Sequence, residues 1–101
     1  MLASVKKAFQ RRQAVQKARI DTTAADLAAQ YQMVEASIEK LESAIEAYDE
    51  AIANGLPAAE IEAKRQAVSD LRSAIVREEE IMRIRERVAT RRFPEQFQWV
   101  K

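Results

Sequence analysis

Two residue types that carry much protein chemistry, cysteine and histidine, are absent from this chain of 101 residues. Disulfides are therefore excluded, as are zinc sites built from thiolate and imidazole ligands. A serine or cysteine nucleophile activated by a histidine is excluded too. Carboxylates alone could still hold a metal, but their spacing here is typical of solvated charge on outer helix faces. We therefore expect that the protein is not an enzyme and has no cofactor, no metal site and no small-molecule substrate.

Helix-breaking residues are equally scarce, with one glycine and two prolines. Ala, Glu, Arg, Ile and Gln are abundant, a bias typical of long helices and coiled coils. The length corresponds to one domain at most. No stretch approaches the ~18 apolar residues needed to span a bilayer, and no secretory signal peptide is recognisable. We therefore expect a protein that is not secreted, located in the cytoplasm or within a virion or another large assembly.

The most regular pattern lies in residues 27–52, where apolar residues recur at alternating spacings of four and three. Such a heptad repeat predicts a helix packed along its length against another helix. The preceding stretch "DTTAAD" offers Thr23 as an N-cap, with Asp26 three residues later as in a capping box. The repeat consists of the a positions Tyr31, Ile38, Ile45 and Ile52 and the d positions Leu27, Val34, Leu41 and Tyr48.

The stretch "ANGLP" predicts a reversal of the chain at residues 54–57. Gly55 can adopt the left-handed conformation that closes a helix, with Leu56 folded back as in a Schellman motif. Pro57 suits the first turn of a second helix. A connection this short makes the flanking helices antiparallel neighbours. We therefore predict an all-α fold in which residues 21–92 form a long antiparallel helical hairpin, a two-helix coiled coil. The second helix continues the seam through Ile61, Val68, Leu71 and Ile75.

Beyond Ile75 the apolar pattern of the second helix changes phase. Ile81, Ile84 and Val88 share a face that is offset from the earlier seam, while Met82 keeps the old phase. This broad stripe indicates that something besides the first helix covers it. Two interhelical ion pairs, Glu42–Arg72 and Asp49–Arg65, are geometrically reasonable on one flank. On the other flank, small residues would let the helices approach closely: Ser37, Ala44 and Ala51 face Ala67 and Ala74.

Charge is distributed in three blocks, although the net charge is only +1. Residues 1–20 hold six basic residues and no acidic one, residues 21–82 are strongly acidic, and residues 83–101 are basic again. Both ends of a hairpin lie opposite its turn, so the two basic blocks should meet at the open end of an acidic rod. Asymmetry of this kind indicates a charged partner. The predicted basic patch comprises Lys6, Lys7, Arg11, Arg12, Arg83, Arg85, Arg87, Arg91 and Arg92.

The first half of the basic N-terminal segment, residues 1–20, is amphipathic, with Leu2, Val5 and Phe9 on one face. Such a segment can dock onto a membrane surface or an acidic partner. Its acid-free, Arg- and Lys-rich composition is also typical of a mitochondrial presequence. A third interpretation is a short helix that folds back on the broad stripe of the second helix.

The C-terminal tail, residues 93–101, carries the aromatic residues Phe93, Phe97 and Trp99. Pro94 ends the second helix, because it lacks an N–H and disfavours helical geometry in the residue before it. Aromatic side chains and arginine are enriched in interface hot spots. This enrichment favours insertion of the tail into a neighbouring subunit. The alternative is that the tail caps its own hairpin.

A hairpin of two helices buries little apolar surface, so apolar groups left at its open end indicate a surface for assembly. We expect a structural or adaptor subunit that docks through its termini into a larger, symmetric assembly of its own copies or of other proteins. A virion or phage component, or an assembly factor, would suit its size and polarity. The predicted partner-binding residues are Leu2, Val5, Phe9, Ile81, Ile84, Val88, Phe93, Phe97 and Trp99.

Two other functions fit the basic ends. A nucleic-acid-associated protein would use residues 1–20 and 83–92 on phosphates. Against it, the acidic shaft would repel phosphate, and the arginines are equally well explained by the acidic shaft of a neighbour. Contacts of a positive end on a negative shaft close into rings or grow into filaments. A membrane-surface protein anchored through residues 1–20 is the third hypothesis.

Overall fold

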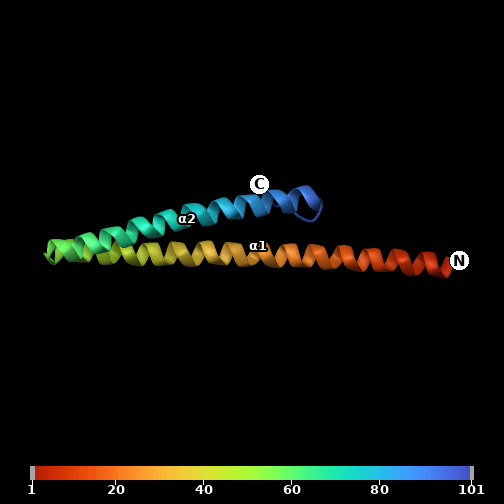
Figure 1. The fold of residues 1–101 in the computed structure, drawn as a ribbon, viewed down its shortest axis with the longest axis horizontal. Helices are drawn as coiled ribbons and strands as arrows, with labels where there is room; N and C mark the ends of the chain where they lie inside the picture. Colours follow the sequence, from red (N-terminus) through yellow and green to blue (C-terminus); the bar gives the residue numbers. More distant parts are fainter. Residues whose placement is uncertain (1, 101) are drawn as a thin grey trace.

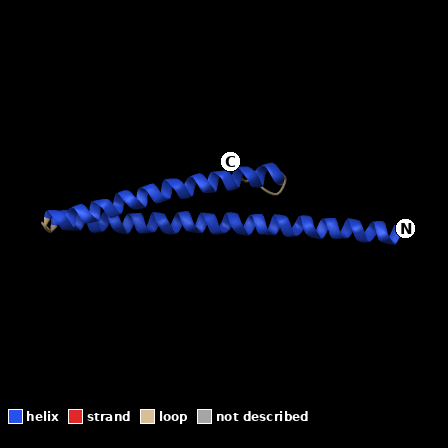
Figure 2. Ribbon diagram, viewed as in Figure 1, coloured by secondary structure: helices blue, strands red, loops and turns tan. Residues whose placement is uncertain are grey.

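The structure, a computed structural model, describes residues 2–100; Met1 and Lys101, at the outer ends of the predicted terminal segments, lie outside the described residues. Two helices make up most of this range: α1 spans Leu2–Ala53 and α2 spans Ala58–Arg92. They form an antiparallel hairpin, and no strand occurs between residues 2 and 100 (Figures 1 and 2). The molecule is a rod measuring 81 × 19 × 17 Å. The predicted all-α helical hairpin is therefore confirmed.

Backbone hydrogen bonds close the C-terminal end of α1. Gly55 has a φ of 64°, in the left-handed region that glycine adopts without a steric penalty. The Leu56 N–H donates to the Ala51 carbonyl (3.1 Å), and the Gly55 N–H donates to the Ile52 carbonyl (3.1 Å). These two bonds form a Schellman motif, which satisfies carbonyls that the last helical turn leaves free. The glycine thus allows the chain to reverse within four residues.

Pro57 lies at the other side of this turn. It is the N-cap of α2 rather than a residue of its first turn, with a φ of −55° and a ψ of 146°. Its carbonyl accepts hydrogen bonds from the N–H groups of Glu60 (3.0 Å) and Ile61 (3.1 Å). Because proline has no N–H to lose, its extended conformation starts the second helix without leaving a donor unsatisfied.

The face of α1 that packs against α2 differs in part from the predicted seam. The d residues line the interface: Leu27 and Val34 are buried, and Leu41 and Tyr48 are half-buried. The second row lies one position before the predicted a residues, so that Ile38 and Ile52 are exposed. Three of its four side chains are small and let the two backbones approach, which turns Ile38 and Ile52 outward. The row consists of Gln30, Ser37, Ala44 and Ala51.

The predicted change of phase in α2 does not occur at the interface. The row that begins with Ile61 and Val68 continues through Met82 to Ala89, whereas Ile81, Ile84 and Val88 stay exposed. The helix keeps its 3.6-residue period, so polar residues enter the interface where the apolar pattern moves away. Glu78 shows this: the Gln30 side-chain Nε2 donates to its carbonyl (3.1 Å). Its Oε2 is buried without a hydrogen-bond partner among residues 2–100.

The residues after α2 close the open end of the hairpin. Phe93 and Phe97 are 6% and 2% exposed, and they pack with Leu27 of α1 and Ala89 of α2. We call these four residues the open-end cluster. Figure 1 shows α1 and α2 separating away from the turn, so the wider end needs side chains of aromatic size. The backbone of the tail is held by hydrogen bonds from the N–H of Phe97 to the carbonyl of Phe93 (3.1 Å) and from the N–H of Val100 to the carbonyl of Phe97 (3.2 Å).

No helix boundary exists at Thr23, so the predicted N-cap there is wrong. α1 is continuous from Leu2, and the Thr23 hydroxyl donates to the Arg19 carbonyl four residues earlier (2.8 Å). The Thr22 hydroxyl bonds to the Ala18 carbonyl in the same way (2.9 Å). A threonine inside a helix satisfies its hydroxyl by this back-bonding, and neither glycine nor proline interrupts the segment.

The ion pairs among residues 2–100 all lie within α2, which overturns the two predicted interhelical pairs. Arg65 binds Glu62 on its own helix, with 2.7 Å between Nη2 and Oε1, instead of Asp49. Arg72 makes no ion pair with Glu42 in the described chain. The physical reason is the displaced seam, which carries Glu42 and Asp49 away from the contact line. Within the described residues neither helix is apolar enough over a sufficient length to cross a membrane.

Candidate docking surface

α1 projects far beyond the end of α2, and this projecting part is the largest unpartnered element of the molecule (Figure 1). Every residue from 2 to 19 is exposed. We call residues 2–19 the extension. It is a helix that neither folds back on the hairpin nor touches the stripe of Ile81, Ile84 and Val88, so the interpretation of a returning helix is wrong. Because α1 contains no breaker, the extension is held in line with the rest of the rod.

The apolar face of the extension is the same face that α1 buries farther along. Leu2, Val5 and Phe9 lie about seven, six and five helical turns before the buried Leu27, each close to a whole number of turns. In the extension these side chains are 88%, 66% and 60% exposed. The seam of the hairpin therefore continues beyond α2, where nothing in the described chain covers it.

The extension also carries one sign of charge. Six basic residues and no acidic residue lie on it, and all six are exposed. Only its last turns approach the other basic block: Val15 and Arg19 border the same hollow as Arg92 and Phe93. Lys6 and Arg12 lie farther out, beyond the tail. The two predicted basic blocks thus meet only along the base of the extension.

An acidic groove lies on the hairpin itself, on the side toward which the displaced isoleucines point. We call it the groove. Its floor is apolar and includes Ile38 of α1 and Met82 of α2, and three carboxylates stand on its α1 side. The apolar repeat does not predict this groove, although the spacing of its acids matches one helix face beside the predicted a row. The lining residues are Tyr31, Val34, Glu35, Ile38, Glu39, Glu42 and Met82.

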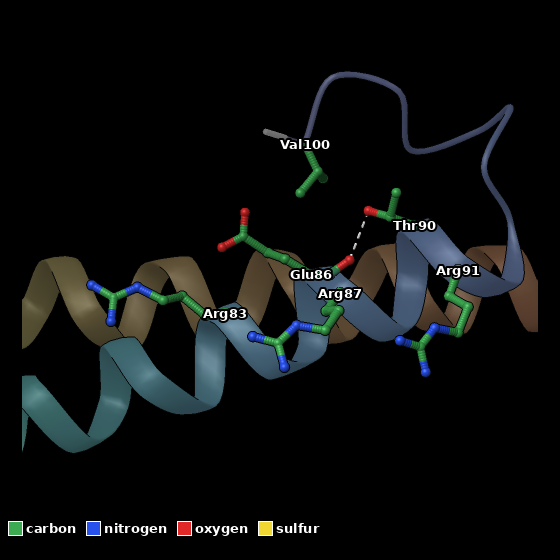
Figure 3. Close-up of a pocket in the computed structure, with 6 residues that line it drawn as sticks. All are labelled: Arg83, Glu86, Arg87, Thr90, Arg91 and Val100. Atoms are coloured by element: carbon green, nitrogen blue, oxygen red, sulfur yellow. Dashed lines mark hydrogen bonds between the residues drawn. The ribbon is translucent and has the colours of Figure 1, made fainter.

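A row of arginines follows the outer side of α2 near its end. Arg83, Arg87 and Arg91 are spaced four residues apart, and Figure 3 shows their guanidinium groups on the side away from the tail. They line a hollow of about 570 Å³ with Glu86 and Val100. Arg83 is shared by two acids, Glu79 and Glu80, at 3.6 Å each. Arg87 and Arg91 form no ion pair within residues 2–100, so their charge is available to an anionic group.

The predicted partner-binding residues fall into three separate places. Leu2, Val5 and Phe9 lie on the extension, whereas Ile81, Ile84 and Val88 are 42–47% exposed on the outer side of α2. Phe93 and Phe97 belong to the open-end cluster and are buried within the chain itself. Trp99 is neither fully exposed nor buried. It is 60% exposed, and its ring centroid lies 6.2 Å from that of Tyr31 and 6.1 Å from that of Phe97. These residues therefore do not form one patch.

Tyr31 connects the open-end cluster to the groove. It packs beside the cluster and also lines the groove. Burial raises the pKa of its hydroxyl above the usual value, and the negative charge of Glu86 on α2 raises it further. The hydroxyl therefore stays protonated where a free tyrosine would begin to ionise.

No cluster of three or more acidic side chains within residues 2–100 has the arrangement of a metal site. Comparison with known proteins gives no relative: no family model, no curated protein and no solved structure matches the chain. The geometry offers surfaces for binding, namely the extension, the groove and the arginine row.

Proposed function

We propose that the protein is a non-enzymatic structural or adaptor subunit that docks through its extension into a larger protein assembly. The single observation that carries this proposal is the exposed apolar face of residues 2–19, which continues the seam that the hairpin buries. A helix face of this kind is normally covered by another helix. Leu2, Val5 and Phe9 are exposed to solvent, so a partner that removes them from water lowers the free energy of the complex.

The context that suits such a subunit is an ordered assembly of many chains. A rod of 81 Å with a single-sign extension can bridge neighbouring subunits along its length. A component of a virion, a phage particle or another large symmetric particle has this requirement. The chain would then work inside that assembly, wherever it is built.

The experiment places a photo-cross-linking phenylalanine analogue at Phe9 in cells that make the protein. Val76 is the matched control, because it is exposed to a similar degree (66% against 60%) but lies on α2. We expect a protein adduct from position 9 and none from position 76. Equal labelling at both positions, or no protein adduct at position 9, would contradict docking through the extension.

A second candidate is a nucleic-acid-associated protein, and one observation favours it. The extension stands clear of the acidic part of the rod, so its six basic residues can reach phosphates without the repulsion that the sequence suggested. This function requires that binding weaken steeply as salt rises. Reversing Arg91 and Arg92 to Glu tests whether the second basic block takes part. Co-purifying nucleic acid that salt or this reversal removes would favour this candidate over protein docking.

A further inference from the structure

The extension of one chain can reach a groove only on another molecule. Phe9 lies about 44 Å from Ile38 along α1, since each helical residue advances by 1.5 Å. No glycine or proline lies between them, so α1 has no residue at which it would bend back. The face of Leu2, Val5 and Phe9 is thus left without a partner from residues 2–100 of its own chain.

The groove has the properties that the extension needs in a partner. Its lining offers Ile38 and Met82 to apolar side chains, and it offers Glu35, Glu39 and Glu42 to basic ones. The acids make no ion pair within residues 2–100. The extension supplies apolar residues and basic residues on one helix, so both parts of the contact are complementary.

We propose that the extension of one copy docks into the groove of a second copy, antiparallel to its α1, with Phe9 over Ile38. In this register Arg12 comes opposite Glu35, and Lys6 comes opposite Leu41, one residue from Glu42. The arrangement is reciprocal, because the separation of Phe9 and Ile38 is the same in both chains. One antiparallel alignment therefore fills both grooves at once and closes as a two-fold dimer.

This dimer rests on the proposed function and names its partner. Two extensions could not pair with each other, because each carries six positive charges and no negative one. The acidic groove removes that repulsion. The dimer also covers Ile38, which the displaced seam leaves 38% exposed. The same displacement that opens the groove thus creates the acceptor for the extension.

A charge exchange tests the proposal without depending on a single variant. One variant carries Lys6→Glu and Arg12→Glu, and the other carries Glu35→Lys and Glu42→Lys. Light scattering should give twice 11.5 kDa for the natural chain. Each variant alone should dissociate at least about tenfold more readily, because like charges then face each other in both contacts. An equimolar mixture should restore the dimer, because both of its contacts are again complementary.

The restoration on mixing separates docking from misfolding, since a damaged chain would not recover by mixing with another. Circular dichroism should show equal helix content in all variants. Arg77→Glu with Arg85→Glu changes the charge by the same amount on the exposed side of α2 and should leave the dimer intact.

A natural chain that stays monomeric at every concentration, or variants that do not complement each other, would overturn self-docking. Co-elution with nucleic acid that Lys6→Glu and Arg12→Glu abolish in a monomeric chain would overturn it as well. A monomer that still cross-links to a foreign protein through position 9 would leave the proposed function standing. Failure of the dimer and failure of the docking function are therefore distinguishable.

Discussion

The two parts of α1 share one helix and one apolar face, yet they lie in opposite surroundings. Residues 20–53 bury this face against α2 and the tail, whereas residues 2–19 leave it exposed. The difference lies in the partner, because α1 has 52 residues and α2 has 35. An amphipathic pattern therefore shows that a face needs covering, while the length of the neighbouring element decides where it is covered.

The extension remains helical without a neighbour for a local reason. Nucleation is the costly step in helix formation, and the hairpin has already supplied a nucleus for α1. Each further residue then adds one hydrogen bond, and residues 2–19 include no glycine or proline. Lengthening such a helix therefore costs little. Its free end also unfolds readily, because residues 2–19 have no tertiary contacts that hold them.

Amide hydrogen exchange should give the largest contrast between the two parts. In dilute solution, amides of residues 6–19 should exchange with opening free energies near zero, and those of residues 24–50 should approach the global value, on the order of 5–15 kcal/mol. Raising the protein concentration should slow exchange in the extension alone if a second copy covers it. Equal protection of both parts in a dilute monomer would contradict the view that the extension lacks a partner within the chain.

Truncating one aromatic residue in each part should give the next largest contrast. Phe97→Ala removes a side chain that is 2% exposed and should lower the free energy of unfolding by about 3–5 kcal/mol. Phe9→Ala removes one that is 60% exposed and should leave the monomer unchanged within about 0.5 kcal/mol. Urea unfolding followed by circular dichroism measures both. A comparable loss at the two positions would show that the extension packs on its own hairpin.

The sequence predicts the hairpin because its evidence is local. The glycine and proline at residues 55 and 57 mark the reversal, and the d row of residues 27, 34, 41 and 48 marks the inner face. The second row is harder to predict, and the structure places it one position before the predicted one. Apolar spacing alone favours Tyr31, Ile38, Ile45 and Ile52. Close backbone approach instead favours the small residues beside them, and this choice depends on the geometry of the pair.

The ends of the molecule are harder to predict for the same reason. Thr23 has the residue type of an N-cap, but a threonine can equally satisfy its hydroxyl by bonding back inside a helix. The tail has the composition of an interface, and Phe93 and Phe97 do form one, with their own hairpin. Composition identifies residues that seek a partner, and only the separation of the helices at the open end shows where those two find it.

The turn offers a third, smaller effect. Gly55→Ala places a side chain on a residue with a φ of 64° and should cost about 1–2 kcal/mol of unfolding free energy. The cause is backbone strain alone, because an added Cβ would meet nothing within 4 Å. Gly55→Asn is the matched control and should cost less, since asparagine tolerates the left-handed region better. Equal losses for Ala and Asn, measured by thermal unfolding, would point to a contact instead of strain.

The smallest effect should come from the hydroxyl of Tyr31. Burial, and then the charge of Glu86, raise its pKa in the folded chain above the ordinary value of about 10. Protonated Tyr31 therefore contributes stability that is complete below pH about 10 and is lost as the pH rises through the folded-state pKa. Tyr31→Phe should flatten the fall in unfolding free energy above pH about 10. The comparison with the natural chain isolates the contribution of this hydroxyl.

Tyr48→Phe is the control for this measurement, because it removes the other tyrosine hydroxyl and keeps Tyr31 beside Glu86. It should retain the fall in stability at high pH. If both substitutions give the same pH profile, a raised pKa of Tyr31 is contradicted. If only Tyr31→Phe flattens the profile, the raised pKa that burial and the charge of Glu86 give Tyr31 is confirmed. Docking of a basic extension would then shift the Tyr31 titration toward lower pH, since a nearby positive charge favours the phenolate.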